Sequence, residues 1–178
     1  MEGSPYVCWS PDGSSFGTTP AAYREFVRAA RLRPMLGTKL REFRRGADLL
    51  AVGASIRNAY FWADLPPDVA EAISAAYERL GGATAELVVA GEPAAEPIVE
   101  FLTGPHEVFD QVNGLPALLA ACKRCWTSLF TDRAIMYREV RGIDHLSAEL
   151  SVLVQPARTP LPLLISGEQR VRLLSMTR

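Results

Sequence analysis

The sequence KRCWTSLFTDRAIMYREVRGIDH, residues 123–145, decides the fold, because it joins the two best-defined helices that the chain predicts. Thr131 is a good N-cap for a helix that runs from it to Arg141, and Gly142 is a good terminator. The helix before it covers residues 115–130. Its apolar stripe has the three- and four-residue spacing of an amphipathic helix and consists of Leu118, Leu119, Cys122, Trp126 and Leu129.

Three more helices are predicted on the amino-terminal side. The first begins at Pro20, with Thr19 as its N-cap. The second covers residues 48–63, where Gly53 weakens it by about 1 kcal/mol of helix propensity. The third covers residues 67–80 and ends at two glycines. The predicted core positions of these helices are Tyr23, Phe26, Val27 and Ala30; Leu49, Val52, Ile56 and Tyr60; and Val69, Ile73, Ala76, Tyr77 and Leu80.

Two strands are predicted between and after these helices. Residues 86–90 form a short apolar run, and residues 147–155 alternate apolar Leu150, Val152 and Val154 with other side chains, as a strand with one buried face does. The roughly 20 residues after the first strand contain several prolines and are expected to form a loop. Helices with a small sheet define an α/β protein, in the α+β sense.

Composition limits the classes of protein to consider. A length of 178 residues suits one domain, and 48% hydrophobic with 22% charged residues excludes a wholly disordered chain. No apolar run reaches the roughly 20 residues of a membrane span, and the amino terminus does not have the order of a signal peptide. A cytoplasmic protein without a membrane partner is therefore expected. Three cysteines are an odd number, so no disulfide framework is expected.

Charge is divided unevenly along the chain. Residues 20–60 hold nine Lys or Arg and three acids, whereas residues 61–113 hold one arginine and ten acids. Such blocks indicate solvated faces, a contact between the two segments, or in fewer cases a site for an anion. Basic and aromatic residues do not alternate in the way that nucleic-acid-binding surfaces require, so no nucleic-acid partner is expected.

The 123–145 stretch resembles the ATP-binding domain of the pyruvate, water dikinase (phosphoenolpyruvate synthase) family, which shares this domain with pyruvate phosphate dikinase and rifampicin phosphotransferase. The family's text reads roughly C-W-x-S-L-F-T-x-R-A-x-x-Y-R-x-x-x-G-x-x-H, and every lettered position is present between Cys125 and His145. Residues 11–26 resemble P-x-G-F-x-V-T-x-x-A-Y-x-x-F with small shifts, residues 65–81 resemble the helix before the phosphate loop, and residues 152–155 match V-x-V-Q.

This resemblance implies a partial ATP-grasp-type domain at residues 1–155, followed by a Pro-containing tail at 156–178. It also implies ATP and Mg²⁺ as the family's cofactors and phosphoryl transfer as its activity. By family position alone, the residues expected near a nucleotide are Glu96, Gly104 and Arg133. It implies no catalytic residue and no metal ligand in this chain.

The phosphate-binding elements of the family differ here. Its G-G-K-G-A lysine would precede Pro11, and the ten residues there do not contain it. Its second element reads V-R-S-S-A-T-A-E-D-L-P-x-A-S-F-A-G-Q. A gapless comparison places Val89 at the arginine, Pro93 at the threonine and Pro105 at the glutamine.

Residues 83–113 would also repel a nucleotide. They contain six acids and no Lys or Arg, and each like-charge contact costs about 1 kcal/mol in water and about 4 kcal/mol in a partly screened cleft. We therefore expect a truncated, degenerate relative of the ATP-binding domain, without activity of its own. The alternatives are an interaction or regulatory module that pairs with a dikinase or a separate C-terminal half of the ATP-grasp domain, and an active phosphotransferase of unusual type.

Several side chains with possible chemistry are better explained by structure. Cys122 and Cys125 form C-x-x-C within a predicted helix, and core packing explains them better than a zinc or redox site. Trp126 and Phe130 are likewise expected in the core.

The histidines and arginines leave more alternatives open. His106 lies in the acidic loop, and His145 next to Asp144 could form a catalytic dyad, but no motif places a nucleophile beside them. Arg133 and Arg138 could shape a nucleotide cleft, or could pair with Asp132, Glu139 or a helix end.

Overall fold

A computed structural model of the protein describes residues 4–93 and 108–157. Its five strands form one antiparallel sheet in the order β1-β2-β5-β3-β4. β5 and β3 share the longest ladder, from Leu87 opposite Pro156 to Pro93 opposite Leu150. The strands are β1 (Val7–Trp9), β2 (Phe16–Thr18), β3 (Leu87–Pro93), β4 (Val108–Val112) and β5 (Leu150–Pro156).

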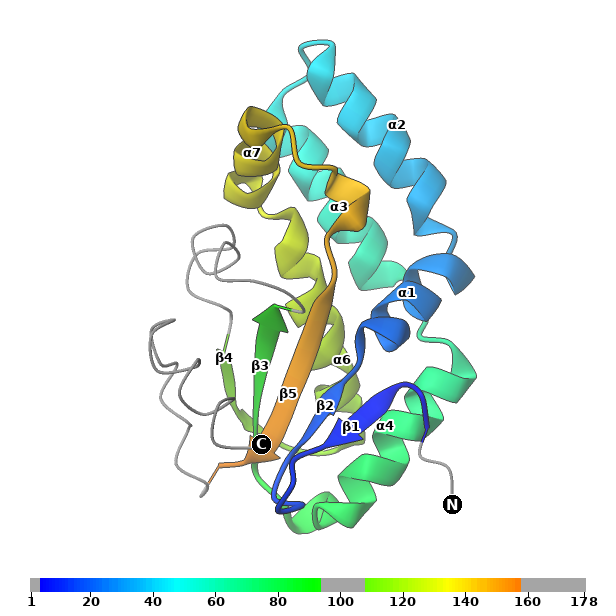
Figure 1. The fold of residues 1–178 in the computed structure, drawn as a ribbon, viewed down its shortest axis with the longest axis vertical. Coiled ribbons are helices and arrows are strands. Elements are labelled where there is room, and N and C mark those ends of the chain that lie inside the picture. The colour runs from blue at the N-terminus through cyan, green and yellow to red at the C-terminus, as the bar shows by residue number, and fades with distance from the viewer. Residues whose placement is uncertain (1–3, 94–107, 158–178) are drawn as a thin grey trace, which may run out of the picture.

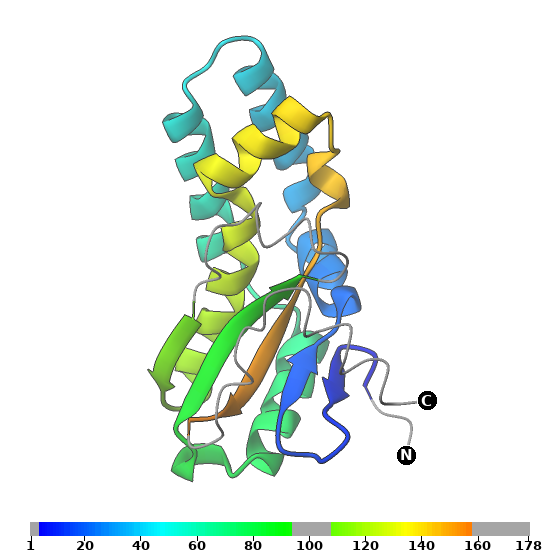
Figure 2. The same ribbon diagram turned by 60° about the vertical axis from the view of Figure 1, so that its left-hand side comes forward.

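Helices cover one face of the sheet and extend beyond its end. The helices are α1 (Pro20–Ala29), α2 (Leu32–Arg44), α3 (Leu49–Trp62), α4 (Pro67–Arg79), α6 (Leu115–Thr127) and α7 (Asp132–Arg141), with short 3₁₀ turns η1 (Gly82–Thr84), η2 (Ser128–Phe130) and η3 (His145–Ser147). α6 packs against β3, β4 and β5, and α4 lies beside α6 (Figure 1). α2, α3 and α7 form a helical layer beyond the sheet, with α2 alongside α3 (Figure 2).

An aromatic cluster joins the helical layer to the sheet. Trp126 of α6 is fully buried and stacks on Phe26 of α1 with ring centroids 5.2 Å apart. Tyr60 of α3 lies 5.4 Å from the Phe130 ring and 5.8 Å from the Phe26 ring. Such pairs contribute about 0.5–1.5 kcal/mol each beyond their buried area. Tyr23 completes the cluster, so four helical segments share one core.

The helices predicted from the sequence are confirmed, with small changes at their ends. Thr131 caps α7 by accepting a hydrogen bond from the Ala134 amide at 3.2 Å, and Gly142 ends it with a φ of 65°. Thr19 stands at the N-cap of α1, but its hydroxyl donates to the Pro5 carbonyl instead of capping the helix. The helix predicted over residues 115–130 finishes as the 3₁₀ turn η2.

The strand predictions are partly confirmed. β5 buries Leu150, Val152 and Val154 as the alternation predicts. The loop predicted after residue 90 is wrong at both ends, because β3 continues to Pro93 and β4 occupies Val108–Val112. A proline is compatible with a strand end, where a missing amide donor costs least.

Besides β4, one helix and two strands were not predicted: α2 and the short strands β1 and β2. α2 buries Leu32, Leu36 and Leu40, which recur every fourth residue. Pro34 lies in its first turn, where the absent amide hydrogen has no intrahelical acceptor. Strands β1 and β2 are three residues each, too short for a pattern to be visible.

The last described residue, Ala157, is still hydrogen-bonded to the sheet. The Ala157 amide donates to the Glu86 carbonyl at 2.7 Å, which extends the β3 and β5 pairing to the last described residue. The predicted boundary between residues 155 and 156 stays a prediction, since residues 158–178 of the tail lie outside the described ranges. Within those ranges no helix has the length and apolar character needed to cross a bilayer.

Candidate functional site

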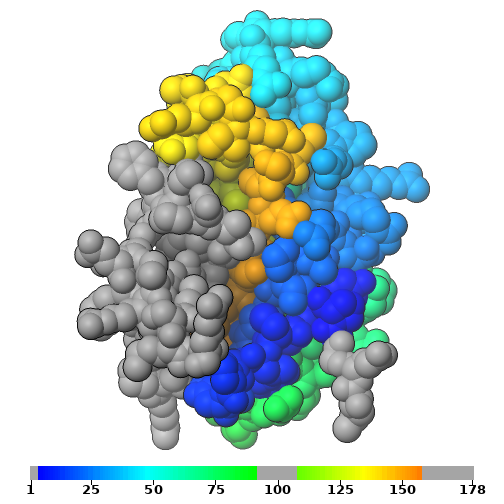
Figure 3. All heavy atoms as spheres, viewed as in Figure 1, coloured from blue at the N-terminus to red at the C-terminus, as the bar shows by residue number. Residues whose placement is uncertain are grey.

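A cavity of about 460 Å³ lies between α1, the start of α2 and the chain that leads into β5. Figure 3 shows this face of the molecule, with residues of η3 and early β5 between α1 and α7. Its walls come from segments far apart in the sequence, which the aromatic cluster holds together. The lining residues are Tyr23, Arg24, Val27, Arg28, Arg31, Arg33, Pro34, Leu36, Phe130, His145, Leu146 and Glu149.

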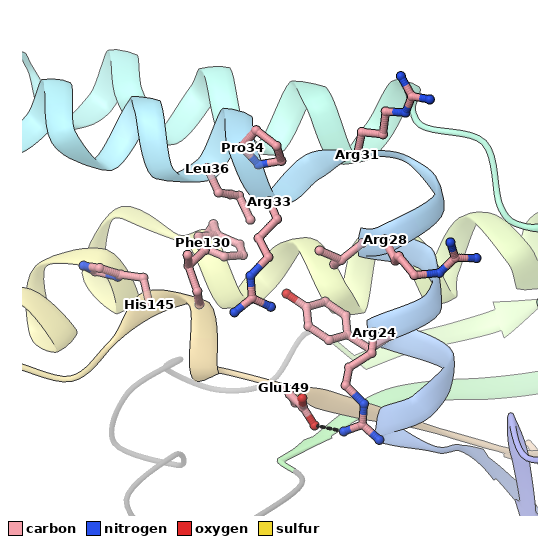
Figure 4. Close-up of a pocket in the computed structure, with 12 residues that line it drawn as sticks. Arg24, Arg28, Arg31, Arg33, Pro34, Leu36, Phe130, His145 and Glu149 are labelled. Atoms are coloured by element: carbon pink, nitrogen blue, oxygen red, sulfur yellow. Dashed lines mark hydrogen bonds and ion pairs between the residues drawn. The ribbon is translucent and has the colours of Figure 1, made fainter.

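Four arginines and one glutamate give the cavity a positive rim. Arg24 pairs with Glu149 at 2.6 Å, while Arg28 pairs with Glu25 of its own helix at 2.5 Å. Among the described residues, Arg31 and Arg33 form no ion pair. Figure 4 shows Arg33 reaching from α2 across the cavity toward the Arg24 and Glu149 pair, whereas Arg31 turns away. Arg33 is therefore the cation best placed to meet a ligand.

A buried tyrosine pair forms part of the cavity wall. The hydroxyl oxygens of Tyr23 and Tyr60 lie 2.9 Å apart, and neither hydroxyl has another partner among the described residues. Burial raises the pKa of Tyr23 to about 12 and the pKa of Tyr60 well above 10.0, so both phenols are neutral. Two hydroxyl hydrogens are present and only one can lie between the oxygens. Either hydroxyl could be the donor, and because Tyr23 lines the cavity and Tyr60 does not, the arrangement in which Tyr60 donates leaves the Tyr23 hydrogen available to a ligand.

His145 belongs to a structural network and not to a dyad with Asp144. Nε of Arg138 donates to Nδ1 of His145 at 3.1 Å, which leaves Nε2–H of the neutral ring to donate to Glu139 at 2.9 Å. Burial lowers the pKa of His145 below its usual 6.5, which favours this neutral form. Asp144 instead accepts from the Leu146 amide as the cap of η3. The dyad considered from the sequence is absent from the described structure.

Arg138 is a buried support. Its guanidinium donates to the Leu129 carbonyl and lies over the Phe130 ring, 5.4 Å from the centroid. Burial lowers its pKa to about 10, which still leaves it charged at neutral pH. Neither Asp132 nor Glu139, the acids considered as partners, pairs with Arg138 among the described residues; its partners are His145 and the Leu129 carbonyl of the turn η2.

The rest of the 123–145 stretch also holds elements together. Nζ of Lys123 donates to the carbonyls of Phe61 and Ala63, both at 2.9 Å, and so caps the end of α3. Asp132 pairs with Arg57 of α3 at 2.7 Å. The segment that carries the family resemblance thus fixes α3, α6 and α7 against one another.

The residues predicted to lie near a nucleotide are not gathered at the cavity. Arg133 is an exposed residue in the first turn of α7 and does not line the cavity. Glu96, Gly104 and His106 lie outside the described residues. Cys122 and Cys125 are buried, and burial raises the pKa of Cys122 to about 12, so the core role predicted for the pair is confirmed.

Sequence reasoning did not identify the cavity residues Tyr23, Arg33 and Glu149. The available signal was the basic excess of residues 20–60, for which an anion site was one of the interpretations left open. Four of those basic residues line one cavity. Composition alone could not show this, because the arginines come from two helices and the turn between them.

Fold and supporting segment together define a mixed α/β domain, with an antiparallel sheet backed by helices and braced by residues 123–145. The family model for the pyruvate phosphate dikinase AMP/ATP-binding domain matches residues 11–166. The chain belongs to this family.

Three relatives agree with this membership. A phosphoenolpyruvate synthase of Synechocystis is 33% identical over 153 residues, which are 80% of this chain and 19% of the relative. A rifampicin phosphotransferase of Streptomyces sviceus is 33% identical over 147 residues, 80% of this chain and 17% of the relative. A probable phosphoenolpyruvate synthase of Methanocaldococcus jannaschii is 31% identical over 156 residues, 82% and 13% respectively. The chain therefore spans less than a fifth of the length of these relatives.

Strand β3 carries the positions that correspond to the arginine of the family's second phosphate-binding element. Val89, opposite the family's arginine in the gapless comparison, is fully buried on the core face. Shifting the comparison by one residue pairs Ala95-Glu96 with the family's Ala-Glu and puts the arginine position at Ala90. Adjacent strand residues point to opposite faces, so Ala90 lies on the face away from the core. Neither position carries a cation.

One buried group on that second face is compatible with a ligand. Gln155, the last residue of the V-x-V-Q match, is 2% exposed, and its Nε2 has no hydrogen-bond partner within residues 4–93 and 108–157. It pairs in register with Val88, so both side chains share the face away from the core. The described residues contain no group of three or more His, Cys, Asp or Glu side chains that could hold a metal. Strand β3 offers no cation for a phosphate.

Proposed function

We propose that this chain is a degenerate dikinase-type nucleotide-binding domain, which keeps the family's scaffold and by itself neither binds Mg-ATP tightly nor transfers phosphate. The observation that carries the proposal is strand β3, where both positions that could hold the family's arginine are apolar, at Val89 and Ala90. The family scaffold is intact around them, since the 123–145 stretch makes its bracing contacts.

Electrostatics supports the same proposal. Phosphoryl transfer depends on cations and backbone donors placed around the transferred group. Residues 83–113 carry six acids and no Lys or Arg. Each phosphate brought close to one such acid costs about 1 kcal/mol even at the dielectric of water. The apolar residues at the arginine position and the added acids both weaken the binding of a nucleotide phosphate.

Calorimetric titration of the chain with Mg-ATP tests the proposal. We expect a Kd weaker than about 1 mM, which corresponds to a binding free energy of about −4 kcal/mol or less in magnitude. Arg133→Ala removes the one described residue assigned to the nucleotide by family position, and it should leave the titration unchanged. Arg141→Ala, in the last turn of the same helix, is the matched control. Saturable micromolar binding that Arg133→Ala abolishes and Arg141→Ala preserves would contradict the proposal.

The second candidate function is an interaction module that pairs with a dikinase or a separate polypeptide carrying the rest of an ATP-grasp domain. It is favoured by exposed apolar side chains on α3, where Phe61 is 53% and Trp62 is 78% exposed. Burying such a pair at an interface would contribute about 1.5–3 kcal/mol for each side chain. Size-exclusion chromatography with a purified family dikinase should show co-elution that Trp62→Ser weakens. Separate elution of the wild-type chain and the dikinase argues against this role.

A further inference from the structure

We propose that the arginine-lined cavity binds an amphipathic organic anion, that is, a small molecule with an apolar body and one carboxylate, sulfonate or phosphate group. The inference stands apart from the proposed function, because no cavity residue belongs to the acidic segment 83–113 or to strand β3. The cavity touches the chain just before β5, whereas Gln155 lies near the other end of that strand. At about 3.3 Å per residue, the two ends are about 20 Å apart.

The cavity has the size and walls of a small-molecule site. Its volume of about 460 Å³ falls within the range of roughly 300–1,000 Å³ that ligand pockets occupy. Val27, Leu36, Phe130 and Leu146 supply apolar and aromatic wall, and Phe130 is held in place by the Arg138 guanidinium over its ring. An aliphatic chain or an aromatic ring of the ligand would remove this surface from water.

The polar end of the cavity suits one anionic group. Arg33 extends into the space without a carboxylate partner among the described residues (Figure 4). Tyr23 lines the same cavity, and its hydroxyl hydrogen is available to a ligand when Tyr60 donates to it. A charged donor and a neutral hydroxyl donor together match the oxygens of a carboxylate, sulfonate or phosphate.

The remaining charges favour an anion over a cation. The acid on the wall, Glu149, is already paired with Arg24. His145 is neutral because its pKa is lowered by burial, so it neither adds nor removes charge. The first turn of α2 carries no acid, and the positive end of its dipole lies at Arg33 and Pro34 on the rim. A cationic ligand would be repelled by Arg33, which has no carboxylate partner among the described residues.

Fluorescence titration with a matched pair of probes tests the inference. The probe 1-anilinonaphthalene-8-sulfonate has an aromatic body and one sulfonate, and N-phenyl-1-naphthylamine has the same body without the charge. We expect the sulfonate to bind at one site with a micromolar Kd, at least about tenfold tighter than the neutral probe, since one charge-assisted hydrogen bond accounts for a factor of this size.

Two arginine variants of α2 locate the binding site. Arg33→Gln should weaken binding of the sulfonate about tenfold and leave the neutral probe unchanged. Arg41→Gln makes the same change of charge on the same helix at a residue that does not line the cavity, and it should have no effect. Both positions are exposed, so both variants should keep the wild-type thermal midpoint. Equal effects of the two variants, or equal affinity for the two probes, would overturn the inference.

Competition identifies the chemical source of the anion. Octanoate and phenyl phosphate carry a carboxylate on an aliphatic body and a phosphate on an aromatic body, and displacement of the sulfonate probe by either supports the site and names the ligand class. Octanol has the body of octanoate without its charge and should displace the probe at least about tenfold less well. Displacement by octanol as good as by octanoate, or by none of the three, contradicts the proposal.

Discussion

Gly53 shows how a single residue can support a tertiary contact by having no side chain. A Cβ built on this glycine of α3 would lie 2.1 Å from Oδ1 of Asp132 and 2.6 Å from Nη1 of Arg57. Those two atoms form the ion pair that ties α3 to the start of α7. From the sequence, Gly53 is only a residue that weakens a helix. Asp132, whose carboxylate occupies the space beside Gly53, lies 79 residues further along the chain.

Replacing Gly53 by alanine should therefore not stabilise the protein, although alanine is the better helix former. We expect the helix-propensity gain of about 1 kcal/mol to be offset, because the new Cβ displaces a partly exposed ion pair that contributes up to about 1 kcal/mol. Gly37 of α2 is the control, because a Cβ there would lie 3.5 Å from Nη1 of Arg41, an ordinary contact. Gly37→Ala should raise stability by up to about 1 kcal/mol. Urea denaturation measures both, and a Gly53→Ala protein as stable as Gly37→Ala would show that the contact does not matter.

Arg138 and His145 show the limit of sequence reasoning about single residues. Their positions in the family text could be read from the sequence, and Arg138 was given a pairing role as one alternative. Their partners could not be read in full, since the Leu129 carbonyl is a backbone atom and the ring of His145 returns to Glu139 around the turn at Gly142. A neighbouring Asp144 suggested a dyad only because it is adjacent in sequence.

At the scale of elements, an ion network joins α2, α7 and η3. Arg44 of α2 pairs with Glu139 of α7 at 2.7 Å, and Glu139 accepts from His145 of η3 at 2.9 Å. The hydrogen bonds from Arg44 and then His145 lower the pKa of Glu139 from 4.5 to about 2. The network therefore favours ionised Glu139 together with neutral His145.

This network predicts that stability falls as the pH is lowered. Below pH 6.5 the unfolded chain protonates His145 before the folded chain does, because burial lowers its folded pKa. From pH 4.5 to about 2 the unfolded chain likewise protonates Glu139 first, so the contribution of Glu139, complete above 4.5, is lost. The thermal midpoint should thus decrease from pH 7 toward pH 3.

Glu139→Gln isolates the lower part of this dependence. The variant should have a lower thermal midpoint than wild type at pH 7, and the difference should shrink as the pH falls below 4.5. Glu71→Gln, at an exposed residue of α4, should follow the wild-type curve. A constant difference between Glu139→Gln and wild type from pH 7 to pH 3 would show that Glu139 does not titrate in this way. Differential scanning fluorimetry across the pH series is sufficient.

Elements were predictable where one face is apolar over several turns and where caps agree with it. α4 and α7 satisfy both conditions, whereas α6 satisfies the first. α2 was missed because Pro34 and Gly37 resemble breakers, although one lies in the tolerant first turn and the other is simply helical. β4 was missed because its burial alternation is irregular and Gln111 has a φ of 55°.

At the scale of the whole molecule, the division of charge has a different meaning from the one expected. A contact between the basic segment 20–60 and the acidic segment 61–113 was one expectation. In the described ranges, the long-range ion pairs of the basic segment go instead to acids of the carboxyl-terminal third, as Arg24–Glu149, Arg44–Glu139 and Arg57–Asp132. Of the basic residues without an ion pair in the described ranges, Arg31 and Arg33 line the cavity.

The fold and the family could be anticipated from the sequence, whereas the cavity could not. Membership rests on the text between Cys125 and His145, which is local in sequence. The cavity needs side chains from α1, α2, η2 and η3 at one place, and this juxtaposition exists only after folding. The family can therefore be recognised from a local sequence segment, whereas a cavity built from distant segments cannot be predicted from the sequence.

The central claim is that the chain keeps the family's fold but does not bind the phosphates of Mg-ATP tightly. A residue-resolved NMR titration with Mg-ATP tests it most directly. We predict that the backbone amide signals of β3, residues 87–91, do not shift up to about 1 mM nucleotide. A Kd of about 1 mM corresponds to a binding free energy of about −4 kcal/mol. Saturating shifts of these amides at micromolar Mg-ATP would show that the strand holds the nucleotide and would contradict the account.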